Sequence, residues 1–295
     1  MASPLQQLPG ELFTALQRLV PQHTLSRLLA KLAESQTPWL KRMLIERFVA
    51  AYDINLEEAL ESDTEAYSSF NAFFTRQLKP NARPLNETPN TITSPADGTV
   101  SQVGYLDGEK LIQAKGKTFS ASTLLASSSD ARLFEQGAFT TIYLSPRDYH
   151  RVHIPVDGKL KHCRYVPGQL FSVNRATTTH IPNLFARNER LVCLFETPVG
   201  NVAVILVGAM LVAGIGTVWQ PRYSPNPRGI IEQPFDGEAN TVLKKGDQLG
   251  HFDFGSTVIM LFEKDSIDWQ VSLTSGTTVK MGEKLAEAAS VNAPA

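Results

Sequence analysis

From about residue 92 onward, glycine turns divide the chain into short runs rich in valine, isoleucine, threonine and aromatic residues. Such residues suit the pleated surface of a β-sheet. Asp-Gly and Pro-Gly pairs are frequent in tight turns because glycine adopts the backbone conformations that those turns need. This pattern predicts hairpins in a β-dominated core. The pairs are Asp97-Gly98, Asp107-Gly108, Asp157-Gly158, Pro167-Gly168 and Asp236-Gly237.

The first part of the chain differs, because its leucines recur at the spacing of an amphipathic helix between Leu5 and Leu19. A later helix should begin at Thr37-Pro38, since threonine caps a helix and proline suits its first position. We therefore predict an α+β protein, with N-terminal amphipathic helices in residues 1–66 followed by a β-dominated core with hairpins in residues 67–295.

Aromatic residues cluster just after an acidic stretch. Ser62-Asp-Thr-Glu65 is a capping-box pattern, in which the first and last side chains satisfy each other's backbone N–H groups. The pattern predicts a helix that starts there and carries Phe70, Phe73 and Phe74.

Charge separates the same two parts. Residues 1–50 carry six basic and three acidic side chains, a net +3, whereas the whole chain has a formal net charge of -1. Without an overall basic surplus, nucleic acid is not a predicted partner. The basic helices have two interpretations: packing on the domain that follows, or lying in a membrane interface beside anionic head groups. Charge alone does not decide between them.

Three features concern the location of the protein. Two cysteines, Cys163 and Cys193, are too few for a disulfide framework or a cysteine-rich metal site. The N-terminus lacks the basic start and cleavage site of a signal peptide, which predicts a reducing, cytoplasmic-side location. The apolar stretch 202–218 is long enough for a membrane span, but its glycines and β-branched residues favour two buried strands joined by a glycine turn.

Two of the six histidines lie close together, at His150 and His153. On a helix such a pair could bind a metal. However, Val152 and Ile154 favour an extended chain, in which the two rings would face opposite sides. No metal site is therefore predicted, and ordinary structural histidines remain an equal alternative at this point.

A reactive hydroxyl is a candidate in Gly255-Ser256-Thr257, which has strand-like sequence on both sides. Glycine there permits an unusual backbone conformation or a close approach of another group. Serine needs a base to become a nucleophile, and the usual base is a histidine oriented by a carboxylate. Asp97 offers a carboxylate, although an Asp-Gly pair is also ordinary turn chemistry.

Together these segments resemble the proenzymes of the phosphatidylserine decarboxylase family, of the bacterial membrane-associated type. They follow the family order from about residue 40 to about residue 260, and those ending at His153 and starting at Asn183 are the most specific. Many members have leucine where this chain has Phe254. Both residues are apolar, so an apolar residue precedes Gly255-Ser256 in either case. The matching segments are 70–76 with Arg83-Pro84, 94–98, 113–116, 143–153, 165–174, 183–190 and 254–258.

The resemblance implies that the chain cuts itself between Gly255 and Ser256, into residues 1–255 and 256–295. Ser256 Oγ would attack the Gly255 carbonyl to give an ester, and β-elimination would then break that ester and leave a pyruvoyl group derived from Ser256. The family's maturation triad falls on Asp97, His153 and Ser256. His153 would take the hydroxyl proton, while Asp97 would hold the imidazole and stabilise its charge.

The implied activity is that of a pyruvoyl-dependent carboxy-lyase, housed in the β-rich catalytic domain. The pyruvoyl carbonyl forms a Schiff base with the amine of phosphatidylserine, accepts the electrons left by departing CO2 and yields phosphatidylethanolamine. By the family's pattern, His150 is the candidate proton donor. Ser172 and Asn174 are candidates for the substrate head-group site.

A lipid substrate also favours the membrane interpretation of the N-terminal helices, because the enzyme has to reach a bilayer. The predicted location is peripheral, on the cytoplasmic side of the cell membrane. Residues 1–255 and 256–295 would stay associated after cleavage, and dimers are usual in the resembled family.

Two alternatives remain at this level. A serine hydrolase could use Asp97, His153 and Ser256 in an intact chain, although the sequence has no Gly-x-Ser-x-Gly elbow. A non-catalytic lipid-binding or lipoyl-like β module would account for the Lys-x-Gly turns, but it leaves the two-histidine segment unexplained.

Overall fold

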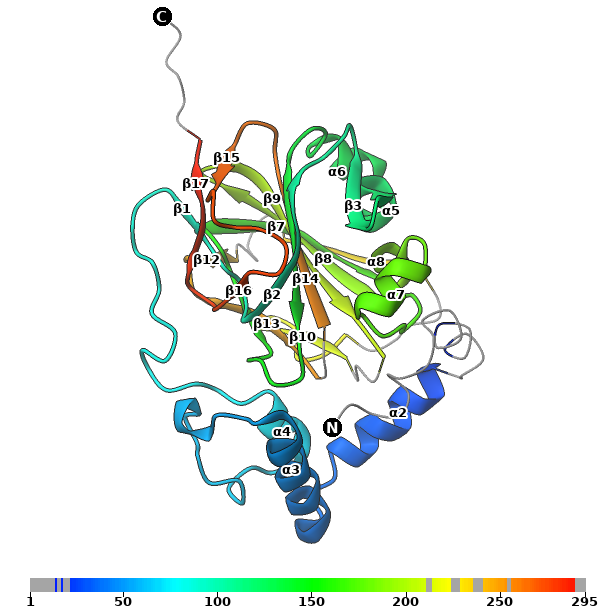
Figure 1. The fold of residues 1–295 in the computed structure, drawn as a ribbon, viewed down its shortest axis with the longest axis vertical. Coiled ribbons are helices and arrows are strands. Elements are labelled where there is room, and N and C mark those ends of the chain that lie inside the picture. The colour runs from blue at the N-terminus through cyan, green and yellow to red at the C-terminus, as the bar shows by residue number, and fades with distance from the viewer. Residues whose placement is uncertain are drawn as a thin grey trace, which may run out of the picture.

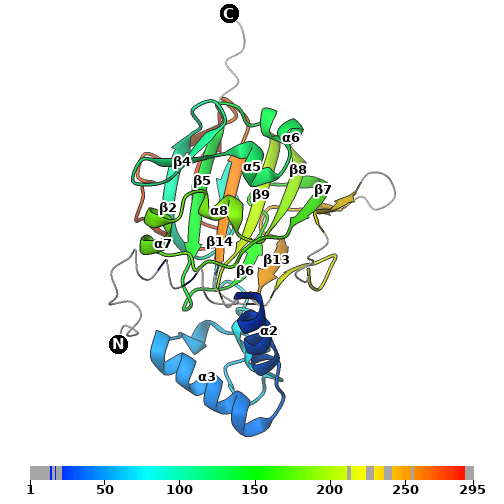
Figure 2. The same cartoon turned by 90° about the vertical axis from the view of Figure 1, so that its right-hand side faces the viewer.

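The N-terminal helices lie together below the β-rich body in two perpendicular views (Figure 1 and Figure 2). The structure is a computed structural model that describes residues 14, 17, 22–210, 214–223, 229–235, 241–253 and 256–289, with only the backbone of Arg175 and Ser256. Helix α2 spans Gln22–Ala33 and α3 spans Pro38–Tyr52. Thr37 is the N-cap of α3 and Pro38 its first residue, as predicted. Most of the predicted Leu5–Leu19 helix lies outside the described residues.

The aromatic cluster joins α3 to a short helix, α4, which spans Phe70–Phe74. Ser69 caps α4 by accepting the Ala72 N–H, so the predicted helix start at Ser62 is wrong. The 3-10 helix η2, Leu56–Glu58, and turns occupy the intervening chain. Phe70, Phe73 and Phe74 are buried against α3 in a small core of their own. The domain boundary between residues 66 and 67 remains a prediction.

A nine-stranded antiparallel sheet forms the centre of the β body, and β14 lies in its middle with a partner on each side. Ladders of backbone hydrogen bonds therefore hold β14 along both of its edges. In spatial order the strands are β11, Ile231–Pro234; β7, Gly158–Val166; β8, Arg190–Thr197; β9, Gly200–Gly208; β14, Ser256–Phe262; β5, Ala138–Leu144; β2, Gly98–Tyr105; and β16, Thr278–Val279; β12, Val242–Leu243, also pairs with β7.

Smaller elements cover both faces of this sheet. One core joins the large sheet to two three-stranded sheets, and a second core joins its other face to a hairpin and short helices. The first group comprises β1, Thr91–Thr93; β17, Lys284–Ala288; β15, Ile267–Trp269; β10, Ile215–Thr217; β13, Gln248–Phe252; and β6, Arg151–His153. The second group comprises β3, Lys110–Ala114; β4, Lys117–Ser120; α5, Ala121–Leu125; α6, Ser128–Arg132; α7, Arg175–His180; and α8, Leu184–Arg187.

Burial on both faces explains why the central strands are continuously apolar. Along β9, Val204 and Leu206 contribute to the first core, while Ile205 and Val207 contribute to the second. The apolar stretch 202–218 thus contains strands, as predicted, although part of its expected glycine turn lies outside the described residues. Within the described part of the chain, no helix has the length and apolar character needed to cross a membrane.

The glycine turns predict the fold class correctly, although only some of them form hairpins. Asp107 and Lys110 exchange both backbone hydrogen bonds around Gly108, whose φ of 60° suits a tight turn. By contrast, Gly98 and Gly158 are the first residues of β2 and β7, so their Asp-Gly pairs lie at the start of a strand and not in a hairpin turn. Asp236-Gly237 lies outside the described residues. The α+β prediction is confirmed: helices come first and a β-rich core follows.

Candidate active site

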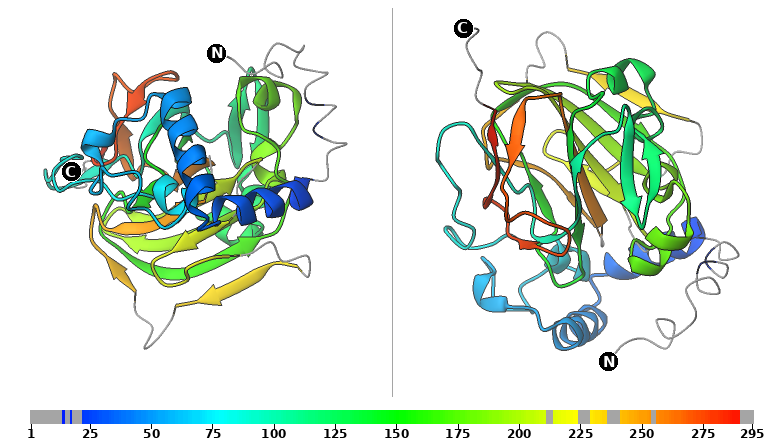
Figure 3. Two further views of the ribbon diagram at one scale, coloured as in Figure 1. Left: turned by 90° about the horizontal axis from the view of Figure 1, so that it is seen from below. Right: turned by 45° about the horizontal axis from the view of Figure 1, so that its top comes forward.

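Four strands bring the predicted site segments to one end of the large sheet. Ser256, the first residue of β14, pairs with Leu144 at the end of β5 and with Gly208 at the end of β9. On the other side of β5, Thr99 of β2 pairs with Tyr143, and Asp97 lies two residues before it. Figure 3 shows from below that α2 and α3 lie across this end of the β body.

Gly98 is required by this close arrangement. A Cβ atom on Gly98 would lie 2.4 Å from the Tyr143 carbonyl oxygen, so a side chain there would push β2 away from β5. The Asp97-Gly98 pair therefore has a second role beyond turn formation. It keeps the Asp97 carboxylate against the end of the sheet.

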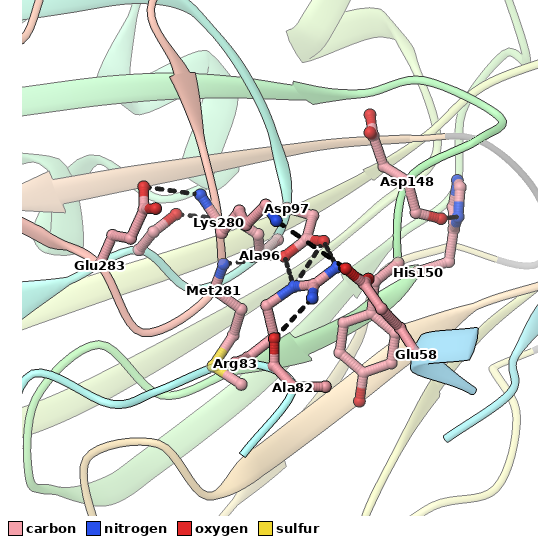
Figure 4. A network of polar contacts seen from close by, with 12 residues as sticks. Glu58, Ala82, Arg83, Ala96, Asp97, Asp148, His150, Lys280, Met281 and Glu283 are labelled. Atoms are coloured by element: carbon pink, nitrogen blue, oxygen red, sulfur yellow. Dashed lines mark hydrogen bonds and ion pairs between the residues drawn. The ribbon is translucent and has the colours of Figure 1, made fainter. Parts of the chain in front are cut away.

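Asp97 is paired with an arginine, which the sequence analysis did not assign to the site. Arg83 Nε donates to Oδ1 at 2.9 Å, and its Nη2 donates to Oδ2 at 2.6 Å, as Figure 4 shows. The Met281 N–H also donates to Oδ1, at 2.8 Å. Arg83 and Asp97 side chains are each only 8% exposed, and Arg83 reaches Glu58 as well. Burial opposes the charge of Arg83, but its bonds to Asp97 and Glu58 outweigh that effect and raise the pKa of Arg83.

His153 is buried and held at both ring nitrogens. Nδ1 lies 2.8 Å from the Gly246 carbonyl oxygen and must therefore donate, which leaves Nε2 as an acceptor for the Tyr149 hydroxyl at 3.2 Å. Burial lowers the pKa of His153, and the hydrogen bond to Gly246 and the charge of Asp97 partly offset this lowering. The ring is thus neutral near pH 7, with its basic nitrogen turned toward Tyr149. The expectation that Asp97 holds the imidazole is therefore wrong for this structure: the Gly246 carbonyl orients the ring, the Asp97 oxygens bond to Arg83 and Met281, and Asp97 acts on His153 only through its charge.

His150 lies beside the same sheet end, against the ring of Phe74 at a centroid distance of 4.1 Å. Its Nδ1 donates to the Asp148 carbonyl at 2.7 Å (Figure 4). Nε2 is buried and has no partner among the described residues. Burial lowers the pKa of His150 to about 3, despite the Asp148 bond. In this state the imidazole is neutral, and its free nitrogen can accept a hydrogen bond.

Arg76 is a second arginine that sequence reasoning missed. Its side chain is buried, and neither Nε nor Nη1 has a partner among the residues that the structure describes. Burial lowers the pKa of Arg76, and the charge of Asp97 partly offsets this. The only signal for it was its place in the matched segment 70–76.

A cavity of about 620 Å³, lined by both apolar and polar side chains, opens on the face of β14 that carries Thr257. Thr257, the residue after Ser256, lines it together with Tyr143 and Lys115. The hydroxyls of Thr141 and Thr257 are buried there without a partner in the described part of the chain. Unsatisfied buried hydroxyls are costly, so this cavity is suited to a polar ligand that bonds to them.

The two candidate head-group residues have different positions. Asn174 lines this cavity and caps α7 in a capping box with Thr177. Ser172 instead bonds to Gln17, whose amide both donates to the Ser172 hydroxyl and accepts its backbone N–H. Ser172 therefore ties the N-terminal segment to the loop before α7. Gly255 lies outside the described residues, and no side-chain position is described for Ser256.

No group of three or more His, Cys, Asp or Glu side chains in the described residues is arranged to hold a metal ion. The described residues thus place a buried carboxylate paired with an arginine and two buried neutral imidazoles in the segments next to this sheet end.

Comparison with known proteins assigns the chain to a family. A family model described as phosphatidylserine decarboxylase matches residues 70–287, and another described as PSD matches residues 12–53. The chain belongs to the phosphatidylserine decarboxylase family. The longer match runs from α4 into β17, so Arg83, Asp97, His150, His153 and Ser256 all lie within it.

Relatives support the assignment over nearly the whole chain. A protein of Ectopseudomonas mendocina is 50% identical over 280 residues, covering 94% of this chain and 98% of its own length. One of Saccharophagus degradans is 47% identical over 278 residues, covering 94% and 97%. One of Acinetobacter baumannii is 48% identical over 279 residues, covering 95% and 97%. Each is named phosphatidylserine decarboxylase proenzyme, and none of these names supports the hydrolase or the non-catalytic module.

Proposed function

We propose that this chain is a phosphatidylserine decarboxylase proenzyme that cleaves itself between Gly255 and Ser256. The observation that carries the proposal is the neutral, buried His153 beside the Asp97–Arg83 pair, at the sheet end where β14 begins with Ser256. A histidine that is neutral at working pH can take the proton of a serine hydroxyl.

Each neighbour of His153 has a task in this proposal. The Gly246 carbonyl fixes the ring with Nε2 unprotonated, which is the form that a base needs. Asp97 stabilises the imidazolium once the proton has been taken, because its negative charge raises the pKa of His153. In the uncut chain the Tyr149 hydroxyl donates a hydrogen bond to His153 Nε2. Burial raises the pKa of Tyr149 to about 12, so this hydroxyl stays protonated.

The proposed cofactor is a pyruvoyl group made from Ser256. The hydroxyl of Thr257, the residue after Ser256, and Nε2 of His150 are buried without a partner in the described part of the chain, and such orphaned polar atoms fit a polar ligand or group. Once formed, the group supplies conjugated carbonyls that accept the electrons left behind when the substrate loses CO2. The chain's own residues then have to hold the substrate and move protons.

His150 is the proposed proton carrier for the decarboxylation. Its low pKa means that it gains a proton at Nε2 only transiently, and a weakly held proton is readily given up again. The Asp148 carbonyl holds Nδ1, so proton exchange is confined to Nε2.

The cavity beside Thr257 is the proposed site for the phosphatidylserine head group. Asn174, Tyr143 and the two unpartnered threonine hydroxyls offer hydrogen bonds, and Lys115 at the rim offers a positive charge for the phosphate. Lys115 is exposed and has a φ of 47°, a conformation that non-glycine residues seldom adopt. Ser172 contributes indirectly, by tying the N-terminal segment to the loop that carries Asn174.

The helical layer is the proposed membrane contact, peripheral and on the cytoplasmic side. Leu28 and Trp39 are 61% and 68% exposed, which is high for such large apolar side chains. Basic residues of α2 and α3 lie among them. Exposed apolar side chains interleaved with basic ones are typical of helices that lie in a membrane interface.

The chain composition of the purified protein tests the proposal. Self-cleavage predicts two fragments, residues 1–255 and 256–295, and the smaller one should resist Edman sequencing because its terminal amine has been lost. Phosphatidylserine vesicles should release CO2 in the presence of the protein. A single intact chain with full decarboxylase activity would contradict self-cleavage.

The two histidines give a matched pair of variants. His153→Ala removes the base, so we expect the chain to stay uncut. His150→Ala keeps that base, so we expect cleavage to proceed while decarboxylation slows by about 100-fold or more, as for loss of a proton-transfer group. Gel analysis and CO2 release measure the two steps separately. Normal processing of His153→Ala would remove it from the triad, and a normal decarboxylation rate for His150→Ala would exclude it as the proton carrier.

The cavity makes a separate prediction. Lys115→Ala should raise KM for phosphatidylserine about two- to fivefold and leave kcat nearly unchanged, because an exposed charge pair contributes about 1 kcal/mol or less. The control is Lys117→Ala, which removes an exposed lysine of the same hairpin outside the cavity lining. Detergent micelles of zwitterionic surfactant suit the assay, because they reduce membrane-charge effects. Equal effects of the two variants would contradict the proposed contact.

A further inference from the structure

The proposed cut falls in the link between two sheets. Strand β13 belongs to a three-stranded sheet with β6, the strand that ends at His153, whereas β14 lies in the nine-stranded sheet. The link runs from Asp253 to Ser256, a step of three residues that spans at most about 11 Å. Ser256 is fixed by its pairs with Leu144 and Gly208. The contacts that hold Asp253 therefore limit how far the bond before Ser256 can move.

Asp253 is a buried carboxylate that none of the proposed steps uses. It is only 3% exposed. Arg222 Nε donates to its Oδ2 at 2.8 Å, and Arg222 Nη2 lies 2.6 Å from the same oxygen. Asn71 Nδ2 donates to Oδ1 at 3.1 Å, and the Asp253 N–H donates to the Gly214 carbonyl oxygen at 3.0 Å. Both carboxylate oxygens and the backbone of Asp253 are thus held.

The helical layer takes part in this anchor. Asn71 belongs to α4, and Arg222 also pairs with Glu34, the residue after α2. The fit is close, because a Cβ atom on Gly214 would lie 2.8 Å from Arg222 Nε and 3.1 Å from Asp253 Oδ2. A larger residue than glycine would push the pair apart. Segments far apart in the sequence therefore converge on one carboxylate where the chain passes from one sheet to another.

We infer that Asp253 is a positioning residue for self-cleavage, whose anchor keeps the Gly255 carbonyl within reach of Ser256 Oγ. In the first step the bond between Oγ and the carbonyl carbon forms, and the bond from that carbon to the Ser256 nitrogen breaks. The hydroxyl proton passes through His153 to this nitrogen. A misplacement of about 1 Å can slow a reaction about 100-fold, so the anchor matters even though it acts through the chain. The inference rests on the proposed self-cleavage.

The test compares Asp253→Ala with Asp253→Asn in the full chain, made by cell-free translation and followed on a denaturing gel. Alanine removes the side-chain anchor, so cleavage should slow by about 10- to 100-fold. Asparagine keeps it, because its oxygen accepts from Arg222 and its N–H donates to Asn71 once the Asn71 amide turns over. That turn breaks no bond of Asn71 Oδ1, which has no partner among the described residues. Cleavage of Asp253→Asn should stay within about threefold of the wild-type rate, since the anchored geometry is kept.

Asp130→Ala is the matched control. Asp130 is also a largely buried carboxylate paired with an arginine, since Arg164 Nη1 lies 2.6 Å from its Oδ2. In both alanine variants the arginine keeps a glutamate partner. Asp130 belongs to α6, at the end of the β body opposite α4 (Figure 1). Asp130→Ala should therefore lose a similar ion pair and still be cut at the wild-type rate.

A second readout separates positioning from a general loss of structure. Asp253 is inferred to act on the cut alone, so the cut fraction of Asp253→Ala should decarboxylate phosphatidylserine with a kcat within about twofold of wild type. The rate is normalised to the number of pyruvoyl groups. A cut fraction with a kcat reduced as strongly as the cleavage rate would overturn the inference.

Asn71→Ala gives the test if Asp253→Ala does not fold. It removes one hydrogen bond of the anchor and leaves the ion pair with Arg222 in place. Loss of this bond should slow cleavage about three- to tenfold. Cleavage of Asn71→Ala at the wild-type rate would contradict the inference.

The outcomes separate this inference from the proposed function. A wild-type chain that never cleaves would overturn both. Normal cleavage of Asp253→Ala, equal slowing of Asp130→Ala, or an Asp253→Asn chain as slow as Asp253→Ala would overturn the role of Asp253 alone.

Discussion

Replacement of Ser256 by alanine is expected to leave one uncut chain that releases no CO2 from phosphatidylserine. The variant loses the hydroxyl that attacks Gly255, and it also loses the atoms from which the pyruvoyl group would be made. Both maturation and decarboxylation should fall below detection, the largest effect expected of any single change here. A denaturing gel and a CO2-release assay measure the two losses.

The fold should survive this change, because the described contacts of Ser256 are backbone pairs with Leu144 and Gly208. Alanine can make the same pairs. The control is Ser266→Ala, whose hydroxyl bonds to the Glu263 carbonyl away from the sheet end, and it should be cut normally. Cleavage of Ser256→Ala at the same position would exclude Ser256 as the nucleophile.

The same geometry explains how two fragments could remain one enzyme. Residues 256–289 include β14, which lies between β9 and β5 in the middle of the large sheet. Val258 to Phe262 are fully buried, with their side chains divided between the two cores. Both ladders and both cores would have to open before the smaller fragment could leave.

Much of the fold was predictable because its signals are local. Glycine turns, β-branched runs and the Thr37-Pro38 cap each depend on residues that are neighbours in the chain. The Ser62 prediction was wrong because a capping-box pattern needs an amphipathic helix directly behind it, and that helix starts only after Ser69. Strand order was not predictable, since β14 pairs with β5 across more than a hundred residues of chain.

The site was predictable only in part. The resemblance selected Asp97, His150, His153 and Ser256, which the fold brings to one sheet end. Their partners Met281 and Gly246 were missed because they bond through a backbone N–H and a backbone carbonyl, which every such residue has whatever its side chain. Arg83 lay in a matched segment, but nothing in the spacing connected it with Asp97.

Arg83→Met is expected to be the most destabilising of the proposed changes. It leaves the Asp97 carboxylate buried, with the Met281 N–H as its one remaining hydrogen-bond partner among the described residues. Removal of one member of a buried ion pair costs about 3–5 kcal/mol. Urea denaturation should be measured in the Ser256→Ala background, so that every sample is a single chain. The control is Arg42→Met, which breaks an exposed pair with Glu46 and should cost less than about 1 kcal/mol.

A double variant separates stability from function at this pair. Adding Asp97→Asn to Arg83→Met removes the uncompensated charge, so the double variant should be more stable than the sum of the two single losses predicts. Self-cleavage should not return, because the charge that stabilises a protonated His153 is then missing. If Arg83→Met costs no more than Arg42→Met, the buried pair does not hold this end of the sheet. If the double variant matures normally, Asp97 acts only as a structural anchor, and His153 works without its charge.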